Sequence, residues 1–159
     1  MTPEQKAASF DTMQHIHEVG KNLHMFAKEL LDRADKHDLS KLESPELEIF
    51  AVASAKLSKL TYGTPEYEES RLALGEALAH HYRVNRHHPE YFIGGISDMT
   101  LVDLVEMLCD WAAAVQRHKD SNLVKSLEIN ISRFGIGEQL ASVLRRTIEA
   151  FYDKDPKNA

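Results

Sequence analysis

The sequence has little of several residue types, and each shortage excludes a class of protein. It contains one cysteine, Cys109, so no disulfide can form within the chain and a reducing compartment suits it. No apolar run is long enough to span a membrane, and the N-terminus lacks the basic and apolar segments of a signal peptide. We therefore expect a soluble cytoplasmic protein that does not enter a membrane.

Positive charge is also scarce. The chain has 19 Lys and Arg residues against 25 Asp and Glu residues, which gives a formal net charge of -6. Binding to duplex nucleic acid needs clustered cations that neutralise phosphates, so duplex nucleic acid is excluded as the main partner. A nucleotide is not excluded, because a bound metal ion can supply positive charge locally.

Strand patterns are missing as well. No stretch alternates apolar and polar residues for long enough to form a strand, whereas apolar residues recur every three or four positions through residues 10–34. The 159 residues are 43% hydrophobic and 28% charged, without a break in composition. These features predict an all-α protein, a single-domain bundle of about six helices over residues 1–152, with a frayed tail at 153–159.

Capping residues and turn formers mark where the helices start and stop. We expect starts at Thr2, Ser44, Thr64 and Thr100, a third helix that reaches Asn85, a loop over 86–99, a fifth helix over 120–134 ended by Gly135, and a last helix over 138–152. The fourth helix should bury one apolar face. That face consists of Leu101, Leu104, Val105, Leu108, Ala112 and Val115.

Histidine, in contrast, is abundant, with nine residues. One of them forms the pair His37-Asp38, followed by Lys41. Adjacent residues cannot share a helix face, but at a helix end both side chains can converge on one metal ion, for which imidazole and carboxylate are good ligands. Lys41 could then contact a phosphate oxygen or a carboxylate. The other interpretation is a solvated surface turn.

The segment from His80 to Glu90, HHYRVNRHHPE, is the strongest signal for a functional site. His81 and Asn85 are one helical turn apart, and His87 and His88 follow closely. Four imidazoles so near one another would repel if they were protonated, whereas a metal ion would hold them neutral. A solvated loop is the alternative interpretation.

Three carboxylates lie at helical spacing in the fourth helix: Asp103, Glu106 and Asp110. An acidic solvent-facing surface explains them about as well as a metal site does. Asp110 differs because Cys109 and Trp111 flank it and indicate a buried setting. A buried carboxylate needs a partner, which could be a metal ion, Arg117 or a histidine of another helix.

The order of these motifs resembles that of the HD-domain superfamily of metal-dependent phosphohydrolases. His15, with Val19 four residues later, looks like the first-helix histidine of that superfamily, and His37-Asp38-Leu-Ser-Lys41 is similar to its H-D-x-G-K motif, with Ser40 in place of glycine. Nearly the whole chain also resembles a family of small uncharacterised bacterial and phage proteins. The blocks that carry this second resemblance are HD-SK, YG-EY, HHY-N-HHPE and DLVEML-DW.

The superfamily resemblance implies a helical domain that holds one or two divalent metal ions (Mn, Fe, Zn, Co, Ni or Mg) and hydrolyses a phosphomonoester or phosphodiester, with a nucleotide as the expected substrate. The implied metal ligands are His15, His37, Asp38, His81, His87, His88 and Asp110. Of these, His81, His87 and His88 would bind either a second metal ion or the substrate phosphate. Asp38 would bridge two metal ions, Lys41 would steady the phosphate, and Glu106 or Glu90 would act as general base. His80, Asn85 and Arg117 would contact the substrate.

Several alternatives stay open. His17 could replace His15 as the first-helix ligand. His15 and His37 would lie roughly 33 Å apart on one unbroken helix, so this site requires a stop or bend at about residues 32–36. A binding module that holds a metal ion or nucleotide without turnover, and an interaction protein with structural histidines, are the other two classes. Self-association into a homo-oligomer is also left open.

Overall fold

The computed structural model describes residues 1–57, 60, 64–116 and 122–152, and of residues 54–57 only the backbone. Within this part of the chain the regular elements are helices and no strand occurs, which confirms the all-α prediction. The chain divides into two compact units, residues 1–37 and 38–159, which are described separately. The predicted tail at 153–159 lies outside the described residues.

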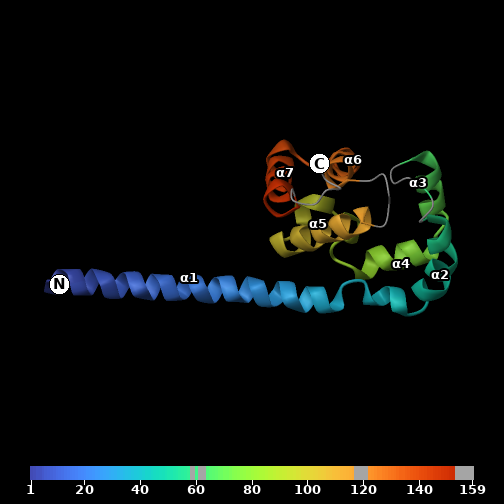
Figure 1. The fold of residues 1–159 in the computed structure, drawn as a ribbon. Coiled ribbons are helices and arrows are strands. Elements are labelled where there is room, and N and C mark those ends of the chain that lie inside the picture. The colour runs from blue at the N-terminus through green and yellow to red at the C-terminus, as the bar shows by residue number, and fades with distance from the viewer. Residues whose placement is uncertain (58–59, 61–63, 117–121, 153–159) are drawn as a thin grey trace. The chain divides into compact units, whose positions relative to one another are not determined.

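The first unit is one helix, α1, from Pro3 to Lys36 (Figure 1). Its start agrees with the prediction: Thr2 accepts a hydrogen bond from the backbone N–H of Gln5, and the Gln5 side chain accepts one from the backbone N–H of Thr2. The helix continues through residues 32–36 and ends at His37, whose backbone N–H donates to the carbonyl of Arg33. None of its residues is buried.

The second unit begins with a short 3-10 turn, η1 (Leu39–Leu42), and continues with α2 (Glu46–Leu57), α3 (Pro65–Leu72) and α4 (Glu76–Val84). The single helix expected from Thr64 to Asn85 is therefore two helices. The break falls at Gly75, whose φ of 49° lies in the left-handed region that glycine enters without steric penalty.

The expected loop over 86–99 contains two 3-10 turns, η2 (Pro89–Tyr91) and η3 (Gly95–Asp98). Helix α5 (Leu101–Val115) starts at the predicted capping box of Thr100 and Asp103. Helix α6 (Leu123–Phe134) begins three residues later than Asp120, because Asn122 caps it, and it ends at Gly135 as expected. Helix α7 (Glu138–Tyr152) has the predicted bounds.

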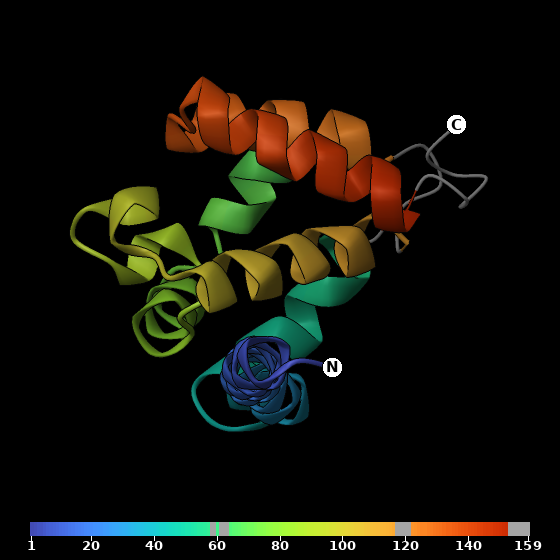
Figure 2. The ribbon, with the colours of Figure 1, turned by 90° about the vertical axis from the view of Figure 1, so that its left-hand side faces the viewer.

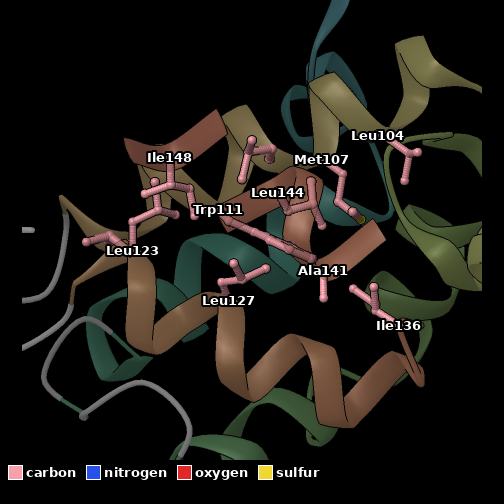
Figure 3. Packing of buried hydrophobic residues seen from close by; sticks show 11 residues of the cluster. Leu104, Met107, Trp111, Leu123, Leu127, Ile136, Ala141, Leu144 and Ile148 are labelled. Carbon is pink, nitrogen blue, oxygen red and sulfur yellow. The ribbon is translucent and has the colours of Figure 1, made fainter. Parts of the chain in front are cut away.

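Helix α6 contacts both α5 and α7 (Figure 2), and these three helices enclose the main hydrophobic core. Figure 3 shows its side chains meeting between the helices, with Trp111 among them. Leu104, Leu108 and Val115 are buried as predicted. Leu101 and Val105 are 69% and 43% exposed, so that part of the prediction is wrong. The buried face of α5 is turned slightly around the helix, and Met107 and Trp111 occupy it instead.

Among the described residues no helix is both long and apolar enough to cross a membrane.

Candidate metal centre

The candidate site begins at the first residue of the second unit, Asp38. Its φ of 59° places it in the left-handed region, which aspartate adopts more readily than most residues. Asp38 immediately precedes the 3-10 turn η1, and this turn brings Lys41 back so that its ammonium group contacts Oδ2 of Asp38. The other oxygen, Oδ1, is directed toward the histidines of the segment from His80 to His88.

These histidines are positioned by the end of α4 and the turn after it. His81 is buried in the last turn of α4, and Asn85 ends the helix. The chain then turns, so that His87 and His88 come back toward His81: the ring centroid of His88 lies 4.8 Å from that of His81 and 4.2 Å from that of His87. His87 is also buried, with 1% of its surface exposed.

Four possible metal-binding atoms converge here, one each from Asp38, His81, His87 and His88, and all lie within 4.8 Å of one another. Nε2 of His81 is 2.9 Å from Nε2 of His88 and 3.4 Å from Oδ1 of Asp38, and Nε2 of His87 is 3.5 Å from the same oxygen. Ligands about 2.1 Å from a metal ion are separated by roughly 3.4 Å in a tetrahedron and roughly 3.0 Å in an octahedron. The spacing of these donors therefore fits a divalent transition metal.

The acidic row of α5 faces the same turn. Asp103 is fully buried and accepts two hydrogen bonds from the Arg86 guanidinium, at 3.1 and 3.0 Å. Oε1 of Glu106 lies 3.2 Å from Nδ1 of His87. Successive residues of the turn thus contact successive carboxylates of the helix, and the interpretation of this row as a solvent-facing surface is wrong.

Asp110 is the third member of this row. One of its oxygens, with donors of Asp38 and His87, belongs to a second group of atoms that lie within 4.8 Å of one another. The side chain is half-buried, and of its two neighbours Trp111 is buried whereas Cys109 is exposed. Nε2 of His87 has a single lone pair and can serve only one of the two groups, whereas a carboxylate such as Asp38 can bridge two metal ions.

Burial favours the neutral form of two rings of this cluster, His81 and His88. Burial first, and then the neighbouring His87 and His81, lower the pKa of His88 to about 2, against the opposing effect of Asp110. The pKa of His81 is also below its ordinary value, first because the ring is buried and then because of Lys41. Neutral imidazole is the form that binds metal, so His81 and His88 are in the required state without losing a proton.

Sequence reasoning missed a carboxylate at the edge of this cluster, Glu46, the first residue of α2. It is fully buried, and its oxygens lie 2.7 Å from Nδ1 of His80, 2.8 Å from Nδ1 of His81 and 3.1 Å from the hydroxyl of Ser40. Burial raises its pKa, but the hydrogen bonds from His80, His81 and Ser40 outweigh this effect, and the pKa stays below its usual value. Nothing in the sequence distinguished it, because acidic residues are common in the first turn of a helix.

The remaining predicted site residues have other contacts. The side-chain amide of Asn85 donates to the Ser40 hydroxyl at 2.8 Å and to the carbonyl of His81 at 2.9 Å, so it stabilises the end of α4. Glu90 pairs with Arg133 of α6 at 2.8 Å. Arg117 lies outside the described residues.

Two predicted ligands, His15 and His37, belong to the first unit, as does His17, the alternative to His15. His15 and the alternative His17 are exposed on α1, and the bend at residues 32–36 that a shared site requires is absent. Within this unit His15 and His37 are about 33 Å apart along the axis, and they cannot bind one metal ion together. His37 is half-buried and is joined to Asp38 by a peptide bond.

Comparison with known proteins places the chain in a family. A model described as a family of unknown function (DUF5662) matches residues 4–154, so the chain belongs to this family. No curated protein and no solved structure matches it significantly.

Proposed function

We propose that the protein is a metal-dependent phosphohydrolase that acts on a phosphate ester, with a nucleotide as substrate class. The observation that carries the metal part of this proposal is the convergence of Asp38, His81, His87 and His88 on one point, with spacing that suits a divalent ion. The resemblance of the H…HD…H…HH…D order to the HD-domain superfamily supports the phosphate-ester part.

Each side chain has a role in this proposal. His81, His87 and His88 would bind one metal ion together with Asp38. Asp110, together with Asp38, would hold a second ion. A bound divalent ion supplies a water molecule of lowered pKa and polarises a phosphoryl oxygen. Lys41, which contacts Asp38, would direct its ammonium group toward the phosphate.

The contact between Glu106 and His87 suggests a different role for Glu106 from that of general base. A carboxylate that accepts the Nδ1 proton of a histidine fixes the ring and leaves Nε2 as the metal ligand. Glu106 has this position, 3.2 Å from Nδ1 of His87, with 11% of its side chain exposed. We assign it to orienting His87.

The test has two stages, both on full-length protein purified without a histidine tag. Elemental analysis and titration with Mn²⁺, Zn²⁺ and Fe²⁺ measure metal binding. Hydrolysis of p-nitrophenyl phosphate, bis-p-nitrophenyl phosphate and a panel of nucleotides then measures turnover, with and without a chelator. We expect bound metal and chelator-sensitive turnover. Metal binding without turnover of any ester would support a non-catalytic metal- or nucleotide-binding module, and absence of both would refute the metal centre.

A further inference from the structure

The buried carboxylate of Glu46 is not one of the converging metal-binding atoms, yet it contacts one of the candidate ligands, His81. It accepts from three groups: Nδ1 of His80 at 2.7 Å, Nδ1 of His81 at 2.8 Å and the Ser40 hydroxyl at 3.1 Å. These donors come from α4 and η1, whereas Glu46 begins α2. A fully buried carboxylate is unfavourable unless such donors compensate for its lost hydration.

We propose that Glu46 is a positioning residue that determines which nitrogen of His81 faces the metal ion. An ionised carboxylate can only accept hydrogen bonds, so the contact at 2.8 Å places the proton of the neutral ring on Nδ1. Nε2 then carries the lone pair, and this is the atom that lies 2.9 Å from Nε2 of His88 and 3.4 Å from Oδ1 of Asp38. Glu46 therefore prepares His81 as an Nε2 ligand.

A second contact at the same nitrogen is consistent with this tautomer. Nδ2 of Asn85 lies 2.9 Å from Nδ1 of His81, but its two hydrogens are used by the Ser40 hydroxyl at 2.8 Å and the His81 carbonyl at 2.9 Å. The Nδ1 proton of His81 is thus left to Glu46. Ser40 takes part in the same arrangement, since it accepts from Asn85 and donates to Glu46.

This inference rests on the proposed metal centre, and Glu46→Gln tests it. The amide has one accepting and one donating end, so it cannot accept from both Nδ1 atoms as the carboxylate does. Either His81 or His80 must change its tautomer, and the ligand ring loses its anionic partner. Loss of such an outer partner typically weakens metal binding about 10- to 100-fold. Glu48→Gln is the matched control, because Glu48 lies in the same first turn of α2 but is exposed.

The measurements are the affinity for Zn²⁺ and Mn²⁺ by titration, the melting temperature of the metal-free protein, and the histidine ring ¹⁵N spectrum of the metal-free wild type. We expect an Nδ1–H tautomer at His81, a loss of affinity of at least about 10-fold in Glu46→Gln and unchanged affinity in Glu48→Gln.

A purely structural anchor between α2 and α4 would lower the melting temperature and leave metal affinity within twofold, and that result would overturn the role of Glu46 while the metal centre stands. An Nε2–H tautomer at His81 in the wild type would overturn it as well, even if the variant does not fold. Failure of the wild type to bind metal would overturn the proposed function and this inference together. This outcome is measured on the wild-type protein and does not depend on any variant.

Discussion

The two units of the chain use histidine in opposite ways. In α1, His15, His17 and His24 are exposed on a helix that has no buried residue. In the second unit His81 and His87 are buried, at 2% and 1% exposure, and each has a carboxylate at its Nδ1 atom. The same residue type in the same short chain is thus solvated in one place and fixed in another. The number of histidines does not define a site, whereas burial and a fixed ring orientation do.

We expect the largest effect from substitution of Asp38, the carboxylate that both groups of donors share. Asp38→Ala should abolish metal binding, by more than the roughly 100-fold typical of a lost outer partner, and leave the helical content nearly unchanged. Alanine is disfavoured at the φ of 59°, so Asp38→Asn is the matched variant: it keeps the side-chain shape and tolerates this backbone conformation. Titration calorimetry and far-UV circular dichroism measure the two properties. Full metal occupancy in both variants would exclude Asp38 as a ligand.

Asp110 tests the second group of donors. Asp110→Leu should abolish metal-dependent turnover, while the metal-free protein keeps its stability or gains up to about 2 kcal/mol, because a half-buried carboxylate is replaced by an apolar side chain. Asp110→Asn, which retains polarity, separates the loss of charge from the change in packing. Turnover and chemical denaturation are the measurements. Wild-type activity in the leucine variant would show that Asp110 is not a ligand.

Substitution of Glu106 distinguishes two roles for this residue, orienting the His87 ring and acting as a general base. If it orients His87, Glu106→Gln should weaken metal binding about 10-fold or more and reduce turnover mainly through metal occupancy, so that excess metal restores much of the rate. A general base would behave differently: metal affinity would be unchanged and the rate would stay low at saturating metal. Turnover measured as a function of metal concentration separates the two roles.

Sequence reasoning predicted the helices, and the residues that form the His/Asp cluster, better than it predicted the contacts of those residues. Local chemistry was sufficient for the capping boxes of α1 and α5 and for the left-handed Gly135 that ends α6. It was not sufficient for Glu46, whose role depends on the 2.8 Å contact with His81, 35 residues away in the sequence.

The acidic row of α5 illustrates the same limit. Helical spacing showed that Asp103, Glu106 and Asp110 share one face, but it could not show whether that face is solvated. The answer depends on the turn at residues 86–88, which brings Arg86 and His87 against the row. Likewise, continuity of α1 through residues 32–36 could not be decided from a pattern that lacks proline and glycine there.

Lowering the pH should reduce the stability of the metal-free protein, because His88 is buried in its neutral form. The pKa of His88 is lowered to about 2 in the fold, whereas an unfolded histidine has a pKa of about 6.5. The unfolded state therefore binds the proton first, and stability that is present above pH 6.5 is lost as the pH falls. From pH 7 to 5 one such ring removes about 2 kcal/mol, or roughly 4–8 °C of melting temperature.

The variant His88→Gln should reduce this dependence, and His24→Gln, exposed on α1, serves as the control. Melting curves of chelator-treated protein at pH 7, 6 and 5 provide the measurement. Equal slopes in the wild type and His88→Gln would contradict the low pKa of His88.

The smallest expected effect concerns α1 itself. His15→Ala and His17→Ala should leave metal affinity within about twofold of the wild type, because neither residue is expected to be a ligand. Loss of a true ligand would lower the affinity by more than the roughly 10- to 100-fold that is typical of an outer partner. His15 lies about 33 Å along an unbroken helix from His37, so one chain cannot bring both to a single ion. Titration of each variant beside His81→Ala, which should lose binding, gives the comparison on one scale. A loss of 10-fold or more in His15→Ala would mean that α1 bends when metal binds or that a second copy of the chain contributes its helix. Sedimentation of the metal-bound protein separates these two cases, since only the second changes the oligomeric state.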